Sequence, residues 1–283
     1  MLRSTVGTRV RVLDGRDLDE ALAVLAVDPV ADVFVASRVA LGGLDAWRLG
    51  AEIWGYGERG RLESLCYAGA NLVPVQASAE AARAYADRAR RQGRRCSSIV
   101  GATEPVMDIW RVVAPTWGPA RDLRAAQPLL AIHAAPLVAP DEQVRRVRLD
   151  EVEVILPACV AMFIEEVGVS PLAGDGGALY RARVTELVAQ GKAFARIDDG
   201  VVVFKAEIGA ATAAVAQVQG VWVHPELRGQ GLGTAGTAAV VAAARADLAP
   251  VVSLYVNDYN LSARRSYEKV GFQQVGMFAS VLF

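Results

Sequence analysis

The stretch VWVHPELRGQGLGTAGTAAV, residues 221–240, decides the fold of this chain. It starts with β-branched residues typical of a strand and then reaches a proline. Four glycines follow within eight residues, and an alanine-rich run after them predicts a helix. Free backbone N–H groups in such a loop, together with the positive end of the helix dipole, bind anions such as phosphate. The stretch therefore predicts a strand, a phosphate-binding loop and a helix in succession.

Two known phosphate-binding motifs can be compared with this loop. A Walker loop needs a lysine directly after its last glycine, and no lysine follows Gly236. The dinucleotide pattern G-x-G-x-x-G does occur, at Gly231, Gly233 and Gly236, with Asp258 near the expected place of a ribose-binding acid. That fold needs its first glycine at the end of the strand, but residues 224–230 intervene here. A nicotinamide-dependent oxidoreductase stays open as the less favoured alternative.

Composition restricts the class of protein. The chain has 283 residues, of which 53% are hydrophobic, and this predicts two domains with packed cores. A formal net charge of −1 gives no overall basic field, so we expect no nucleic-acid partner. We see no signal peptide and no apolar run of ~18 residues, and we expect a cytoplasmic protein without a membrane partner. Three scattered cysteines and two histidines predict no metal site.

Helical and strand-like patterns alternate along the chain, which predicts an α/β fold with mixed α+β sheets. Three prolines between residues 126 and 142 argue against regular structure and place a linker there. We therefore expect a mixed α/β domain at 1–140 and a second domain at 143–283. Within the first domain, residues 64–73 are predicted to form one strand. In the second, we expect helices at 150–166, 178–190, 234–248 and 260–270, strands at 193–197, 201–208, 213–223 and 251–256, and one or two final strands at 272–283.

A second motif lies downstream of the glycine loop. The loop spells R-x-x-G-x-G from Arg228 to Gly233, after V-x-P at 223–225, and N-x-x-A-x-x-x-Y-x-x-x-G-F follows in register at 260–272. With these two motifs the sequence resembles the GNAT superfamily of N-acetyltransferases over roughly residues 145–283, and as a whole a two-domain actinobacterial-type member with an uncharacterised N-terminal region. The resemblance implies a C-terminal GNAT fold with a splayed central sheet. The N-terminal domain is interpreted as a candidate degenerate GNAT-like copy.

The resemblance also implies acetyl-CoA as co-substrate. The loop amides would bind its pyrophosphate, the open strand edge would pair with pantetheine and polarise the thioester carbonyl, and Asn260 would bond the pantetheine arm. The candidate binding residues are Val221, Trp222, Val223, Arg228, Gly229, Gln230, Gly231, Leu232, Gly233, Thr234 and Asn260. Two simpler interpretations stay open. The glycines could simply relieve crowding between helix and sheet, and Asn260 could be a helix cap without binding any ligand.

The predicted reaction is transfer of the acetyl group to an amine, by direct attack in a ternary complex. Tyr267 is the candidate acid that protonates the leaving thiolate, and Glu207 the candidate base. Glu165 and Glu166 would bind the acceptor, a small-molecule or peptide amine. Tyr267 could instead serve packing, and each glutamate could be a solvated surface charge. A second hypothesis, from another class, is a protein that senses acyl-CoA without catalysis. The acceptor's identity and the oligomeric state do not follow from the sequence.

Overall fold

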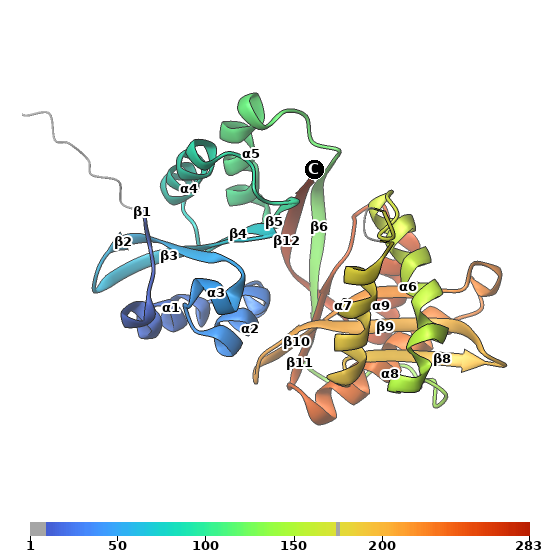
Figure 1. Cartoon of the computed structure of the whole chain (residues 1–283). Helices are drawn as coiled ribbons and strands as arrows, with labels where there is room; N and C mark the ends of the chain where they lie inside the picture. The colour runs from blue at the N-terminus through green and yellow to red at the C-terminus, as the bar shows by residue number, and fades with distance from the viewer. Residues whose placement is uncertain (1–9, 174–175) are drawn as a thin grey trace, which may run out of the picture. The chain divides into compact units, whose positions relative to one another are not determined.

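The computed structural model describes residues 10–173 and 176–283, and the chain divides into two compact units (Figure 1). The first unit comprises the chain through Leu129 together with Gln274–Phe283, and the second comprises Leu130–Gln273. The expected ranges, 1–140 and 143–283, place the boundary later and leave the last strand in the second part. Among the described residues, no helix has the length and the apolar composition needed to span a membrane.

The first unit forms a mixed sheet with helices. Strands β1 to β4 pair antiparallel in succession, and β4 pairs parallel with β5. Its elements are β1 (Val10–Val12), α1 (Leu18–Leu25), α2 (Val33–Gly42), α3 (Ala46–Leu49), β2 (Glu52–Glu58), β3 (Arg61–Ala68), β4 (Asn71–Val75), α4 (Ala79–Gln92), β5 (Ser98–Ala102), α5 (Thr103–Trp117) and β6 (Asp122–Ile132). The prediction of one strand at 64–73 was wrong, because a turn at Gly69 makes it the hairpin β3–β4. The predicted linker also begins too early, since β6 continues to Ile132.

The second unit repeats this succession of elements. Its elements are β7 (Arg145–Arg146), α6 (Val152–Val167), α7 (Ala178–Ala189), β8 (Ala193–Asp198), β9 (Val201–Ala211), β10 (Val215–Val223), α8 (Leu232–Asp247), β11 (Val251–Tyr255), α9 (Leu261–Val270) and β12 (Gln273–Leu282). Strands β7 to β10 pair antiparallel and β10 pairs parallel with β11. In both units, therefore, a strand and helices precede three strands, a helix, a strand, a helix and a final strand. The predicted mixed α/β class is confirmed.

The final strand of the second succession completes the first unit. Strand β12 pairs antiparallel with β5, from Phe278 opposite Ala102 to Leu282 opposite Ser98. Ala279 and Val281 of β12 are fully buried in the core of the first unit. Hydrophobic burial thus attaches the chain's last residues to its first half.

Helices cover both faces of the second unit's sheet, which positions its side chains. On one face, Phe204 and Ile208 of β9 pack in one core with residues of α8 and α9. On the other face, α6 and α7 form a separate core that includes Trp222. Because side chains alternate along a strand, Lys205 and Glu207 point to the face opposite Phe204. Two charged side chains of β9 therefore lie on the α6 side of the sheet.

Candidate functional site

Strands β10 and β11 separate after a short paired segment. Their register covers only Val215 to Gln217 on β10, opposite Val251 to Ser253 on β11. Irregular pairing with β9 beyond Gln217 marks β-bulges in β10, and Gly220 has a positive φ of 59°. Bulges bend a strand away from its neighbour and end the pairing. The rest of β10, including Val221–Val223, therefore presents an open backbone edge, and the predicted splayed sheet is confirmed.

The glycine loop follows β10 directly. A short helical turn at Pro225–Leu227 leads to Gly229 and Gly231, whose φ angles are +79° and +87°. Glycine adopts such angles without strain, and a Cβ at either position would meet open space. Gly236 is small for another reason: a Cβ there would lie 2.7 Å from the ring of Phe204. Gly229 and Gly231 therefore shape the loop, and Gly236 lets α8 approach β9.

The loop offers free donors to a ligand. Gly231 is the N-cap of α8, and its carbonyl oxygen accepts the N–H groups of Thr234 and Ala235. Within the described part of the chain, no backbone hydrogen bond uses the N–H groups of residues 229–233. Unpaired amides at a helix N-terminus, with the helix dipole behind them, attract anions. This arrangement suits a phosphate group.

The corresponding connection in the first unit is closed. Only three residues, 76–78, separate β4 from α4. The hydroxyl oxygen of Ser78 accepts the N–H of Ala81 at 3.2 Å and so caps the helix. Strands β4 and β5 also stop pairing after Leu72 and Ile99, in the manner of β10 and β11. The first unit thus repeats the separated strands without an open phosphate loop.

Arg228 connects the loop to α6. Its Nη2 donates to both carboxylate oxygens of Glu165, at 3.1 and 2.8 Å, and its Nε donates to the carbonyl of Val223 at 3.1 Å. Trp222 Nε1 donates to the same carboxylate at 3.2 Å. Because Arg228 and Glu165 are about half exposed, this ion pair contributes less than about 1 kcal/mol to stability. The structure therefore joins a predicted acceptor-binding residue to two predicted CoA-binding residues.

Glu207 belongs to a buried polar cluster. Its Oε1 accepts a hydrogen bond from Gln219 Nε2 at 2.7 Å, and its Oε2 lies 3.4 Å from Lys205 Nζ. The side chain of Lys205 is 1% exposed, and its Nζ also lies 3.6 Å from Cys159 Sγ. Burial raises the pKa of the Cys159 thiol, against the opposing charge of Lys205. The interpretation of Glu207 as a solvated surface charge was wrong, because Glu207 is buried. Its partners Lys205 and Gln219 compensate for the loss of water around the charge.

Gly220 brings this cluster under the bulge of β10. A Cβ at Gly220 would lie 3.2 Å from Lys205 Nζ and 3.4 Å from the Glu207 carboxyl carbon. The backbone just before Val221 therefore passes against the buried ion pair. Sequence analysis missed Lys205, Gln219 and Gly220, although a glycine inside a strand and two charges on one strand face were visible signals.

Tyr267 lies inside the core of the second unit. Its ring is 7% exposed and makes an edge-to-face contact with Phe272, with ring centroids 5.9 Å apart. Burial raises the pKa of the phenol above its usual value, and the negative charge of Glu166 raises it further. The hydroxyl is therefore protonated at neutral pH, as a general acid must be. Asn260 caps α9, since its Oδ1 accepts the N–H of Ala263 at 3.1 Å.

Two family models match parts of the sequence. Residues 179–272 match the model described as the acetyltransferase (GNAT) family, and residues 51–155 match a domain of unknown function, DUF4081. No curated protein matches the sequence. Among residues 10–173 and 176–283, no cluster of three or more metal-binding side chains occurs.

Several solved structures share the fold over nearly the whole chain. A Drosophila protein from a structural genomics consortium has a TM-score of 0.68 at 13% identity, covering 98% of this chain and 99% of its own. A tandem GNAT protein from the clavulanic acid biosynthesis pathway has a TM-score of 0.55 at 14% identity, covering 96% and 98%. A GCN5-related N-acetyltransferase from Sphaerobacter thermophilus has a TM-score of 0.55 at 16% identity, covering 96% and 93%. These likenesses show a fold in which two GNAT-like units follow one another.

Proposed function

The chain carries a GNAT-family acetyltransferase domain at residues 179–272, and on that premise we propose that it transfers acetyl from acetyl-CoA to an amine. The observation that carries the proposal is the open loop at the start of α8, whose N–H groups at residues 229–233 have no backbone partner among the described residues. The unpaired edge of β10 leads directly into this loop. A phosphate-binding loop next to a free strand edge matches the two halves of CoA, its pyrophosphate and its amide-bearing arm.

The loop geometry disfavours the oxidoreductase alternative. Dinucleotide folds place the first glycine of G-x-G-x-x-G at the end of the strand. Here β10 ends at Val223, and the helical turn Pro225–Leu227 comes before Gly231. Gly236, the last glycine of that pattern, faces the ring of Phe204 and not the loop.

Acetyl transfer requires four events that this site can assist. The amine attacks the thioester carbonyl, the C–S bond breaks, the sulfur leaves with the electron pair and gains a proton, and the nitrogen loses one. The N–H groups of the open β10 edge near Val221 would polarise the carbonyl oxygen. The protonated phenol of Tyr267 would supply the proton to sulfur. Glu207 would accept the amine proton through a water, because Lys205 and Gln219 already engage both of its oxygens.

The acceptor would bind on the α6 side of the sheet. Glu165 and Glu166 at the end of α6 place two carboxylates there, which suits a cationic amine. We assign both carboxylates to the acceptor, and Glu165 is also paired with Arg228 in the structure. The charge of Glu166 also acts on Tyr267, which links the acceptor to the proposed acid.

A non-catalytic acyl-CoA sensor is the second candidate function. The buried pairing of Glu207 with Lys205 favours it, because a base held in an ion pair has less capacity to take a proton. The sensor hypothesis predicts acetyl-CoA binding without acceptor-dependent release of CoA.

Two measurements on the full chain test the proposal. Thermal unfolding with acetyl-CoA or NADH comes first, and we expect only acetyl-CoA to raise the unfolding temperature. Release of CoA thiol is then followed with a panel of small amines and peptides, after subtraction of a blank without acceptor. Acceptor-dependent release supports an acetyltransferase, and binding without release supports the sensor. Stabilisation by NADH alone would overturn both.

A further inference from the structure

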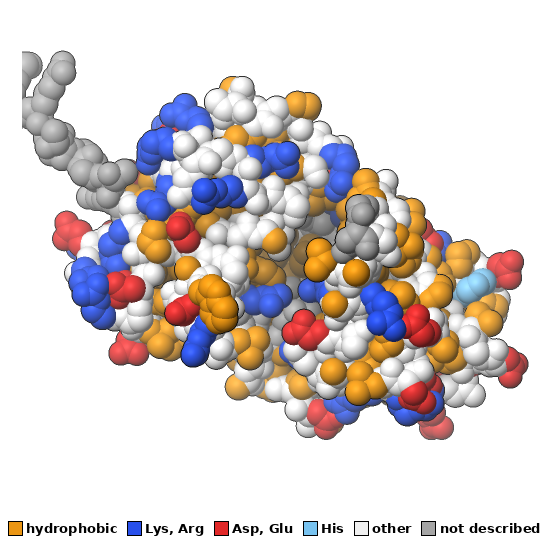
Figure 2. Space-filling model, in the orientation of Figure 1, with side chains coloured by type: hydrophobic (Ala, Val, Ile, Leu, Met, Phe, Trp, Pro, Cys, Tyr) orange, Lys and Arg blue, Asp and Glu red, His pale blue; other side chains and the backbone are white. Residues whose placement is uncertain are grey.

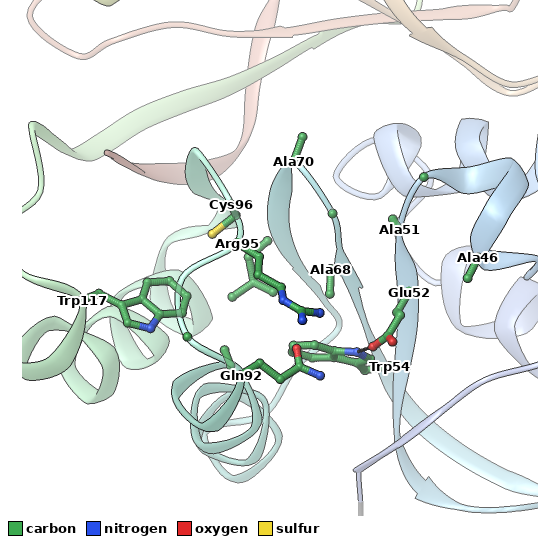
Figure 3. A pocket seen from close by; sticks show the side chains of 15 residues that line it. Ala46, Ala51, Glu52, Trp54, Ala68, Ala70, Gln92, Arg95, Cys96 and Trp117 are labelled. Carbon is green, nitrogen blue, oxygen red and sulfur yellow. Dashed lines mark hydrogen bonds between the residues drawn. The ribbon is translucent and has the colours of Figure 1, made fainter.

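The first unit contains a cavity of about 400 Å³ that no part of the proposed reaction uses (Figure 3). It lies at the end of the unit where β4 begins and α4 ends, against Leu72, Gln92 and Cys96. Strands β4 and β5 are paired at this end, at Leu72 and Ile99, and separate only beyond it. The cavity is therefore not the counterpart of the acetyl-CoA site, which uses the end where the strands part.

Two indole rings form the apolar walls. Trp54 of β2 is buried, its Nε1 donates to Glu52 Oε2 at 2.6 Å, and the guanidinium of Arg88 lies over its ring at 5.0 Å. Arg88 also lies 3.6 Å from Glu52, so this carboxylate already has two partners. The indole of Trp117 extends toward the cavity from the end of α5 (Figure 3). Its Nε1 is buried and has no hydrogen-bond partner among the described residues, an arrangement that costs free energy.

Arg95 supplies an available positive charge. In Figure 3 its side chain extends into the space toward Trp54, and it forms no hydrogen bond or ion pair with the residues that the structure describes. Basic side chains also gather over α4 and α5 in Figure 2, and α4 and the loop after it contribute Arg83, Arg88, Arg90, Arg91 and Arg94. The acidic side chains of α4 are Glu80 and Asp87. The field at the cavity therefore favours an anion.

From these features we infer that the cavity binds a small aromatic carboxylate. The aromatic body would pack against the indole of Trp117 and the alanine side chains of the wall. The carboxylate would pair with Arg95, whose planar guanidinium matches its geometry. This assigns the N-terminal unit a binding function of its own, independent of acetyl transfer.

The test uses 1-naphthylacetate and its neutral amide, 1-naphthylacetamide, as probes of matched shape. Isothermal titration of the full chain should show one saturable site that binds the carboxylate about tenfold more tightly than the amide. Arg95→Gln should abolish this preference, and Arg91→Gln, the same change outside the cavity, should keep it. Trp117→Ala should weaken binding of both probes, because it removes the ring against which the naphthyl group packs.

A filled cavity provides the decisive control. Ala68→Leu places a larger side chain in the space and should abolish binding of both probes, with the circular dichroism spectrum unchanged. If that variant fails to fold, Ala46→Leu on the exposed α3 wall should weaken binding instead. Saturating acetyl-CoA should leave the titration unchanged. The inference is overturned if neither probe binds saturably, if Arg95→Gln keeps the carboxylate preference, or if acetyl-CoA displaces the probe.

Discussion

Gly231 and Gly93 can be compared to test the phosphate loop. Both have a positive φ, +87° and +75°, and a Cβ at either would meet nothing within 4 Å. Aspartate adds backbone strain at both, and more at Gly93, whose ψ is 167° against −6° at Gly231. Only Gly231→Asp, however, brings a carboxylate to the start of α8. We expect that variant to weaken acetyl-CoA binding by about 100-fold, through repulsion of the pyrophosphate, and Gly93→Asp to leave it unchanged. Equal affinities by isothermal titration would show that the loop does not bind phosphate.

Tyr267→Phe separates catalysis from packing. Phenylalanine retains the edge-to-face contact with Phe272 and loses only the hydroxyl. If that hydroxyl protonates the leaving thiolate, turnover should fall by about 100-fold while acetyl-CoA affinity stays the same. Tyr259→Phe, which changes an exposed tyrosine, is the control. Unchanged turnover, with chemistry shown to be rate-limiting, would leave Tyr267 as a wall of the site.

Asp32 in the first unit predicts a pH-dependent stability. Burial raises the pKa of its carboxyl to about 7, against the hydrogen bond donated by Gln76, and the charge of Asp28 raises it further. Below pH about 4 this carboxyl is protonated in both the folded and the unfolded chain, so it does not lower the free energy of unfolding. Between pH about 4 and 7 the unfolded chain loses the proton that the folded chain retains, so stability falls as pH rises, by at most about 4 kcal/mol.

Asp32→Asn removes this cost and preserves an acceptor for Gln76. We expect the variant to unfold at the same temperature as the parent chain at pH 4 and at a higher temperature at pH 8. Asp45→Asn, at an exposed helix cap, is the control. A gain that does not change with pH would contradict the assignment.

At the scale of elements, the charged pair on β9 makes a strong prediction. Lys205→Met leaves Glu207 buried without its cation, which typically costs about 3–5 kcal/mol. Lys205→Met with Glu207→Gln leaves no buried charge, so we expect the double variant to recover most of that loss. Urea unfolding of both variants measures the difference. A double variant as unstable as the single one would show that the two charges are not coupled.

For the whole molecule, strand β12 makes the first unit depend on the chain's last residues. Deleting residues 274–283 removes Ala279 and Val281 from its core and leaves β5 without its antiparallel partner, paired only with β4 over a short segment. We expect amide hydrogen exchange to accelerate in β5 and α5 far more than in β9. Unchanged exchange in β5 would show that β12 does not stabilise the first unit.

The sequence by itself determined the local features of this protein. Strand patterns, Gly271 after the last helix and the spacing of the two motifs predicted the elements of the second unit and the glycine loop, because such signals act over a few residues. They failed at residues 64–73, where an apolar run conceals the turn of a hairpin that only strand pairing reveals.

Only the tertiary structure decided which residues meet. The pairing of Arg228 with Glu165 and of Glu207 with Lys205 and Gln219 depends on helix and strand packing between distant segments. The place of β12 beside β5 and the cavity between Trp54 and Trp117 depend on it as well. Hydrophobic burial and the pairing of buried charges select these partners by their positions in space. The spacing of residues along the chain does not indicate which distant segments will meet.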